Sequence, residues 1–255
     1  MAIHPTAIVD PRACVGADVE IGAHAFVGAG VELGAGCRLL PHAVVLGPAR
    51  LGARNEIHPF AVLGGAPQDK TYRGEPTTLS VGDDNVFREH VTVNRGTTKD
   101  RSETRIGSGG LFMAGTHVAH DCVVGDRVVL ANGTLLAGHV VLDDGVVSGG
   151  GVMVAPFTRI GRVAFLAGGA RVERDVPPFC MAEGDRARIR ALNRVGLSRN
   201  GVAPDDIELL ERAFSTLYRA GDPLLVALER LGALLDHALV RELRDAVRRA
   251  LDEPR

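Results

Sequence analysis

Aliphatic residues recur at every sixth position along the first two thirds of the chain. The repeat runs through residues 3–63, resumes over 81–93, and resumes in a new phase over 106–172, where only Ser148 breaks the aliphatic rule. Six matches neither the helical period near 3.6 nor the strand alternation of two. It therefore marks a structural repeat, and a repeat is a stronger guide to the fold than local propensity.

Each repeat unit has the composition of a short strand followed by a tight corner. A glycine commonly follows the aliphatic residue, and a small residue often stands two positions before it. Glycine permits the corner conformation and a close approach of neighbouring backbones. Three equal strands close a triangle, so one coil takes about 18 residues. We therefore predict a β solenoid, a parallel β-helix whose coils stack about 4.8 Å apart.

Two polar segments, 65–79 and 94–105, interrupt the repeat. Loops inserted into a solenoid tend to lie on one face, which is often the binding face. The alternative is that each loop is a tolerated surface insertion.

The pattern changes after residue 172. The sequence Asp175-Val176-Pro177-Pro178 ends the last coil, and beyond residue 187 glycine is rare while Arg, Leu and Ala dominate. We predict helices over 204–219, over 223–237 behind an Asp222 N-cap, and over 238–252.

These patterns divide the chain into two domains. Residues 1–186 form the β-helix with its two inserted loops, and residues 187–255 form a C-terminal α-helical domain. Solenoids need a cap on their open ends, and the helical domain is placed to provide one.

Composition narrows the function classes. The formal net charge of −2 does not favour nucleic-acid binding, and no apolar run approaches the roughly 20 residues of a membrane span. No signal-peptide pattern opens the chain. The four cysteines have no CxxC spacing, so we expect reduced thiols in a cytoplasmic protein: Cys14, Cys37, Cys122 and Cys180.

The residues with the clearest chemistry lie in two short motifs. One holds His117, His120 and Asp121, and the other holds Gly138 and His139. A coil of about 18 residues places the second motif directly above the first, roughly 4.8 Å away. The repeat therefore joins two separate motifs into one predicted site.

This cluster suits acyl transfer. His120 titrates near neutrality and can take a proton from an attacking hydroxyl or amine. Asp121 can orient the ring, and the backbone N–H of Gly138 can stabilise a tetrahedral oxyanion. Two alternatives stay open: a zinc site that includes Cys122, for which no standard ligand spacing is present, and histidines that only cap polar corners.

Six features of the chain occur in the same order in one known family. The chain resembles the UDP-N-acetylglucosamine acyltransferases of the hexapeptide-repeat superfamily in its helical C-terminus and in five motifs: PQDKTYRGEPT (67–77), VTVNRGT (91–97), HVAHDC (117–122), LAGHV (136–140) and DVPPF (175–179). The resemblance implies transfer of a 3-hydroxyacyl chain from acyl carrier protein to the 3-position of UDP-N-acetylglucosamine, in lipid A biosynthesis.

The resemblance also implies a left-handed coil and a homotrimer with active sites between neighbouring solenoids. Its donor is the thioester on the 4'-phosphopantetheine of acyl carrier protein, and no other cofactor and no metal are expected. Partners are therefore acyl carrier protein and a UDP-amino sugar, without nucleic acid or stable membrane insertion.

Matched position by position, the family's functional residues fall on eleven residues of this chain. The catalytic matches are His120, Asp121 and Gly138, with Gly168 as the acyl-chain ruler. The substrate-binding matches are Gln68, Asp69, Tyr72, His117, His139, Asn193 and Arg199.

Several positions depart from the family pattern. Ala155-Pro156 stands where a His-Gln pair is frequent, Lys70-Thr71 where Leu-Lys is usual, Asn200 where a second Arg is common, and Asn94 where some members have His. All lie where the acceptor or nucleotide is held in the family. A 3-amino UDP-sugar, which would give an amide, therefore stays open as the acceptor.

Two further alternatives keep the solenoid and change its role. The chain can be a non-catalytic trimeric scaffold that binds acyl carrier protein without moving an acyl group. It can also resemble the γ-carbonic anhydrases, which hold a metal with histidines between subunits.

Overall fold

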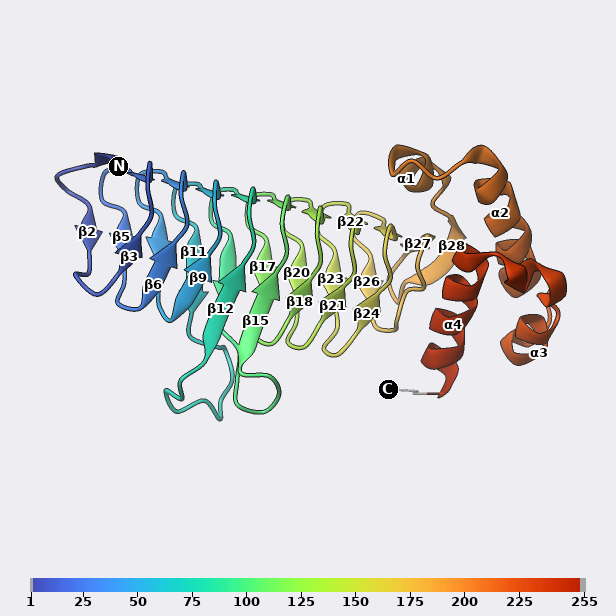
Figure 1. The fold of residues 1–255 in the computed structure, drawn as a ribbon. Helices are drawn as coiled ribbons and strands as arrows, with labels where there is room; N and C mark the ends of the chain where they lie inside the picture. The colour runs from blue at the N-terminus through green and yellow to red at the C-terminus, as the bar shows by residue number, and fades with distance from the viewer. Residues whose placement is uncertain (1, 253–255) are drawn as a thin grey trace.

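Three sheets form the three faces of a β-helix, and their strands are parallel except for one antiparallel pair at the end of the first sheet. The computed structural model describes residues 2–252, with the β-helix at the N-terminal end and helices at the other (Figure 1). The first face has 11 strands in the order β1 (Ala2–Ile3), β4 (Glu20–Ile21), β7 (Arg38–Leu39), β10 (Glu56–Ile57), β13 (Val86–Phe87), β16 (Leu111–Phe112), β19 (Val129–Leu130), β22 (Val147–Ser148), β25 (Phe165–Leu166), β27 (Cys180–Glu183) and β28 (Arg188–Leu192).

The other two faces have nine and eight strands. The second face holds β2 (Ile8–Val9), β5 (Phe26–Val27), β8 (Val44–Val45), β11 (Val62–Gly65), β14 (Thr92–Asn94), β17 (His117–Val118), β20 (Leu135–Leu136), β23 (Met153–Val154) and β26 (Arg171–Val172). The third face holds β3 (Cys14–Val15), β6 (Val31–Leu33), β9 (Ala49–Leu51), β12 (Thr78–Val81), β15 (Glu103–Ile106), β18 (Val123–Val124), β21 (Val141–Leu142) and β24 (Arg159–Ile160).

The strand register confirms the predicted coil length. β17 pairs with β20 so that His117 lies opposite Leu135, and Arg50 bonds to Glu32 across a separation of 18 residues. The sixth-position side chains point inward, and Leu63, Phe112 and Leu136 are fully buried. The repeat therefore encodes the core.

Ser148, the exception to the aliphatic rule, is also buried. Its hydroxyl lies 2.8 Å from Oγ1 of Thr134 and accepts a bond from the Ala131 N–H at 3.1 Å. A buried hydroxyl is tolerated in a core when it is hydrogen-bonded. The Thr134 side chain of the coil before provides that partner.

Both inserted loops lie at the corner between the second and third faces. Val62 pairs with Thr92 instead of Ser80, and Thr92 pairs with His117 instead of Gly110, because each loop lengthens its coil. The loops project together from one side of the β-helix (Figure 1). His120 lies at the same corner, between β17 and β18, so the loops border it.

The chain after the coils differs in part from the prediction. Residues 188–192, expected to begin a helical domain, form β28, which pairs antiparallel with β27 after a turn at Gly184 with φ of 102°. This hairpin extends the first face past the last coil. The division at residue 187 stays a prediction.

Four α-helices and one 3₁₀ helix follow among the described residues. They are α1 (Arg194–Arg199), α2 (Pro204–Tyr218), α3 (Leu224–Glu229), the 3₁₀ helix η1 (Gly232–Asp236) and α4 (Ala238–Asp252). The helices predicted over 204–219 and 238–252 are confirmed as α2 and α4. None of the helices within 2–252 combines the length and apolarity that crossing a bilayer requires.

The helix predicted over 223–237 is wrong in extent. α3 ends at Glu229, and Gly232, with φ of 46°, starts η1. Asp222 does not cap α3; its carboxylate pairs with Arg230 instead. Two short helices, α3 and η1, therefore stand where the composition predicted one continuous helix.

Helix α4 is tied to the β-helix by one bidentate ion pair. Arg162 donates to both carboxylate oxygens of Glu242 at 2.6 and 2.7 Å. Planar fork-to-fork pairing of this kind fixes orientation as well as distance. It holds α4 against the last coils.

Candidate active site

The candidate site lies at the corner between the second and third faces, where β17 and β20 end. Nδ1 of His120 donates to Oδ2 of Asp121 at 2.8 Å, and Asp121 is fully buried while His120 is partly exposed. Because Nδ1 carries the proton in this bond, Nε2 keeps its lone pair. The pair has the arrangement of a general base and the carboxylate that orients it.

Asp121 is held by the second inserted loop. Its two oxygens accept bonds from the N–H of Thr97 at 2.9 Å and from the Thr97 hydroxyl at 2.7 Å. Its own N–H donates to Oγ1 of Thr104 at 2.8 Å. These bonds compensate the buried charge, so the carboxylate stays fixed beneath the ring of His120.

Gly138 lies against His120, as the 18-residue period predicts. The next residue, His139, donates its N–H to the carbonyl of His120 at 3.0 Å. Within residues 2–252, the N–H of Gly138 donates to no backbone or side-chain acceptor. A free backbone donor beside the base is what an oxyanion hole requires.

His139 lies between two carboxylates. Its Nδ1 is 3.2 Å from Oδ2 of Asp100, on the second loop, and its Nε2 is 3.7 Å from Oδ2 of Asp121. The ring meets that of His120 edge to face, with centroids 5.2 Å apart, and stacks on Phe157 of the following coil at 4.4 Å. Four residues from two neighbouring coils and a loop thus fix one imidazole.

His117 lies on the second face, beside this corner. Its Nδ1 is 2.7 Å from Oγ1 of Thr92, its neighbour in the coil before. Burial and the neighbouring His120 hold the pKa of His117 below its ordinary value. The neutral form is therefore favoured, which suits a hydrogen-bonding wall of a pocket.

The first inserted loop presents Asp69. Its oxygens accept bonds from Lys99 Nζ at 2.6 Å and from both the N–H and the hydroxyl of Thr71 at 2.7 Å. The Lys99 ammonium, followed by the Thr71 bonds, holds the pKa of Asp69 well below its usual range. The Lys99 pair also ties the second loop to the first.

Tyr72 and Gln68 flank Asp69 on the same loop. The Tyr72 hydroxyl donates to the carbonyl of Glu75 at 2.9 Å and receives a bond from Arg95 at 3.4 Å. Gln68 is exposed. Both residues lie on the loop that borders the corner. Within residues 2–252, no hydrogen bond joins either side chain to His117, His120 or His139.

The other predicted site residues lie elsewhere in the same chain. Gly168 is at the corner between the first and second faces, one full face away from His120. Asn193 caps α1, accepting from the N–H of Gly196 at 3.0 Å and donating to the carbonyl of Val163 at 2.8 Å. Arg199 is the last residue of α1, and α1 lies near the C-terminal end of the β-helix, away from β17 (Figure 1). Their substrate roles stay predictions.

The positions that depart from the family pattern have local structural partners. Asn94 donates to the carbonyl of Ala66 at 3.0 Å, and Asn200 donates to that of Gly196 at 2.9 Å. Pro156 is exposed. Thr71 stands where the family usually has a lysine, and it bonds to Asp69. The cation that pairs with Asp69 is Lys99.

His120, Asp121 and His139 place one potential metal-ligating atom each within 4.8 Å of one another. A closed zinc site takes four ligands, and Asp121 already accepts three bonds from protein donors. Burial raises the pKa of the nearby Cys122 to about 12, and its Sγ bonds to the carbonyl of Ala137 at 3.2 Å. This donor set favours internal hydrogen bonding over metal ligation.

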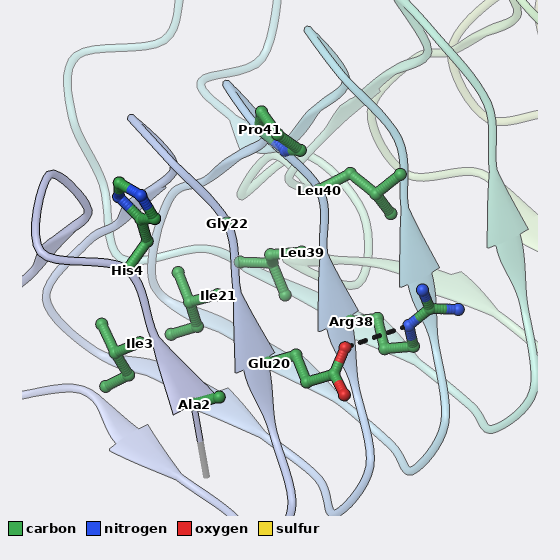
Figure 2. Close-up of a pocket in the computed structure, with 10 residues that line it drawn as sticks. All are labelled: Ala2, Ile3, His4, Glu20, Ile21, Gly22, Arg38, Leu39, Leu40 and Pro41. Carbon is green, nitrogen blue, oxygen red and sulfur yellow. Dashed lines mark hydrogen bonds and ion pairs between the residues drawn. The ribbon is translucent and has the colours of Figure 1, made fainter.

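A shallow hollow on the first face near the N-terminus lies apart from this corner. Residues of β1, β4 and β7 line it, including Ile3, Ile21 and the ion pair of Glu20 with Arg38 at 3.3 Å (Figure 2). It carries none of the predicted site residues.

Sequence reasoning missed Thr97, Lys99, Asp100 and Phe157. Three of them lie on the second loop, which has no repeat to give its register. One feature of the sequence indicated that these loop residues reach the site: the insertion lengthens the coil next to the histidine motif. Phe157 follows the period one coil beyond His139 and was open to the same argument.

Comparison with known proteins gives a consistent set of relatives. Residues 175–252 match the family model described as UDP-N-acetylglucosamine O-acyltransferase, domain 2. An acyl-[acyl-carrier-protein]–UDP-N-acetylglucosamine O-acyltransferase of Halorhodospira halophila is 48% identical over 92% of both chains. One of the same description from Thiobacillus denitrificans is 45% identical, over 97% of this chain and 96% of its own.

Solved structures agree over the whole described fold. The crystal structure of a UDP-N-acetylglucosamine O-acyltransferase from Moraxella catarrhalis RH4 is similar with a TM-score of 0.93, at 38% identity over 98% of both chains. The similarity therefore extends over both the β-helix and the C-terminal helices.

Proposed function

Because the chain belongs to the family of acyl-[acyl-carrier-protein]–UDP-N-acetylglucosamine O-acyltransferases, we propose that it transfers a 3-hydroxyacyl chain from acyl carrier protein to the 3-hydroxyl of UDP-N-acetylglucosamine. The product would enter lipid A biosynthesis. The donor thioester is carried on the 4'-phosphopantetheine of acyl carrier protein, and the proposal includes no further cofactor.

The observation that carries this proposal is the bond between His120 Nδ1 and Asp121 Oδ2 at 2.8 Å. It leaves Nε2 of His120 free to accept the proton of the sugar hydroxyl. The hydroxyl oxygen then attacks the thioester carbonyl, and the negative charge develops on the carbonyl oxygen. The free N–H of Gly138 stands beside the ring and can stabilise that charge.

Collapse of the intermediate completes the transfer. The C–S bond breaks as the carbonyl re-forms, and the His120 imidazolium returns its proton to the leaving thiolate of the phosphopantetheine. Asp121 stabilises the imidazolium throughout because its carboxylate is fixed by Thr97. No other proton carrier is required by this sequence of steps.

The two loops are proposed to hold the acceptor. Asp69 and Tyr72 lie on the first loop, and His117 and His139 line the corner below it. Gln68, Asn193 and Arg199 complete the proposed contacts, with the last two contributed at a neighbouring protomer's site. Gly168 is proposed to limit the acyl chain.

A homotrimer in the cytoplasm, with left-handed coils, is part of the same proposal. Large apolar side chains stay exposed on the second face and its corners: Phe60 at 51%, Leu135 at 43%, Met153 at 44% and Phe157 at 55%. Leu135 and Met153 are register partners on neighbouring strands, and exposed apolar side chains of this kind mark contacts between proteins. A sedimentation-equilibrium mass of three chains supports the proposal, and a monomeric mass contradicts it.

A 3-amino UDP-sugar is the second candidate acceptor. Ala155 provides no polar side-chain atom beside the corner, Pro156 provides none either, and Thr71 is engaged with Asp69. A neutral amine would attack the same thioester with His120 as base, and the product would be an amide.

Mass spectrometry of the products from one mixture distinguishes the candidates. The mixture holds 3-hydroxyacyl carrier proteins of several chain lengths, UDP-N-acetylglucosamine and its 3-amino analogue. The proposal predicts ester as the main product. Predominant amide would select the second candidate, and no acylated product from either acceptor would point to a non-catalytic solenoid.

A further inference from the structure

Asp100, on the second loop, contacts His139. Its Oδ2 is 3.2 Å from Nδ1 of His139, across a separation of 39 residues. His139 is only 12% exposed, whereas Asp100 is 38% exposed and also lies 3.3 Å from Arg101. The loop therefore brings a carboxylate onto an otherwise enclosed ring.

The contact fixes the tautomer of His139. An ionised carboxylate only accepts hydrogen bonds, so Nδ1 of His139 must carry the proton that it shares with Asp100. Nε2 then lies 3.7 Å from Asp121, which is beyond hydrogen-bonding distance. Asp121 is already engaged with Thr97 and His120. The lone pair of His139 Nε2, which faces the corner that holds His120, is thus free to accept a hydrogen bond.

The loop is anchored on both sides of Asp100, by Thr97 and Lys99 before it and by Thr104 after it, whose Oγ1 accepts the N–H of Asp121 at 2.8 Å. Thr97 bonds to Asp121 through its N–H and hydroxyl, and Lys99 pairs with Asp69 at 2.6 Å. The Thr97 and Thr104 bonds hold the loop against the corner, and the Lys99 pair holds it against the first loop. These bonds to residues of the site therefore fix the position of Asp100.

We propose that Asp100 is a positioning residue: it holds the Nδ1 proton of His139, so that Nε2 of His139 accepts a hydrogen bond from a hydroxyl of the acceptor sugar. This role rests on the proposed function for its substrate. It makes acceptor affinity, and not donor affinity, depend on the second loop. Asp100 itself touches no reacting atom.

Replacement of Asp100 by Asn tests the proposal in the full chain. The amide can offer an N–H to Nδ1 and so favour the opposite tautomer, in which Nε2 carries the proton. We expect the KM for UDP-N-acetylglucosamine to rise by up to about tenfold, the scale of one neutral hydrogen bond, while kcat and the KM for the acyl carrier protein stay nearly unchanged.

Two further variants separate positioning from a general effect. Asp100→Glu keeps the carboxylate and should recover most of the acceptor affinity. Asp84→Asn is the matched control, because Asp84 pairs with Arg54 at 2.6 Å at a corner away from the site, so that this variant should keep the wild-type constants. Failure of the glutamate variant to recover, together with equal losses in kcat and both KM values, would overturn the positioning role.

The tautomer itself is measured by ¹⁵N NMR of histidine-labelled protein without substrate. The His139 signals, assigned by comparison with His139→Gln, should change from Nδ1-protonated in the wild type to Nε2-protonated in Asp100→Asn. An unchanged tautomer contradicts the proposal. Because this readout needs no turnover, it remains decisive even if the wild type transfers no acyl group, an outcome that would overturn the proposed function alone.

Discussion

Gly138 lies so close to His120 that a Cβ atom at position 138 would be 2.6 Å from Cε1 and 2.9 Å from Nε2 of the ring. The contact arises from the coil register, which stacks the corner after β20 on the corner after β17. The φ of Gly138 is not positive, so its backbone conformation would accept a side chain. The imidazole ring of His120 is what excludes one. The glycine and the base therefore form one unit.

Gly138→Ala should lower kcat about a hundredfold, the scale of losing one oxyanion donor, because the added methyl group displaces His120 from the free N–H. The melting temperature should change little, since only a partly exposed side chain must move. Steady-state kinetics and thermal unfolding measure both. Gly28→Ala is a control, because its Cβ would meet Phe26 Cε1 at 3.4 Å and the backbone N of Gly47 and O of Val45 at 3.5 Å, all ordinary contact distances. Equal activities in the two variants would contradict this reading.

Asp121→Asn should lower kcat by about a hundredfold or more, because an amide cannot accept all the bonds now made by Thr97 and His120. It should also cost about 1–3 kcal/mol of unfolding free energy, the usual cost of an unsatisfied buried group. Denaturant unfolding and single-turnover kinetics provide the two values. Asp126→Asn, at a corner where the Asp126 carboxylate accepts a bond from the Ser108 N–H at 2.7 Å, is the comparison. Retained turnover in the Asp121 variant would exclude the dyad.

His117 should make stability depend on pH. Its pKa is lowered in the folded state, first by burial and then by His120, so the unfolded chain binds the proton more readily. Its contribution is fully present above the unfolded value of about 6.5 and is lost as the pH falls through the folded value. Melting temperatures at pH 7.5 and 5.5 should therefore differ less in His117→Gln than in the wild type. An identical difference in both proteins would refute this assignment.

Lys99→Met should loosen the first loop, because it removes the ion pair that joins Lys99 to Asp69 across the two insertions. Hydrogen–deuterium exchange over residues 65–79 should become faster, and the difference from the wild type should shrink at high salt, where exposed pairs are screened. Lys70→Met is the control on the same loop. If both variants exchange like the wild type, the pair does not order the loop.

The repeat predicted the β-helix because its period is a geometric property of the coil. Leu136 and Phe112 are buried for the same reason that Gly138 meets His120: one register sets both. Even the exception, Ser148, fits, since Thr134 satisfies its hydroxyl. Where the period holds, sequence positions translate directly into spatial neighbours.

Outside the repeat this translation fails. Lys99 and Asp100 reach Asp69 and His139 through loop conformations that have no period, so their contacts were not predictable from spacing. Helix α3 ends at Glu229 although the helical composition continues past it, and Gly232 starts a separate 3₁₀ helix. Strand β28 formed because it pairs with β27, a tertiary partner that local composition does not reveal.

The most direct test is acyl transfer by His120→Ala. The variant should lose nearly all turnover with acyl carrier protein thioester and UDP-N-acetylglucosamine, since general-base catalysis is worth about 10²–10⁴-fold. It should keep the wild-type circular dichroism and oligomeric mass, because His120 lies at a corner outside the core. Loss of turnover with an intact fold is the predicted result. Near-normal turnover in the folded variant would contradict the mechanism built on His120, Asp121 and Gly138.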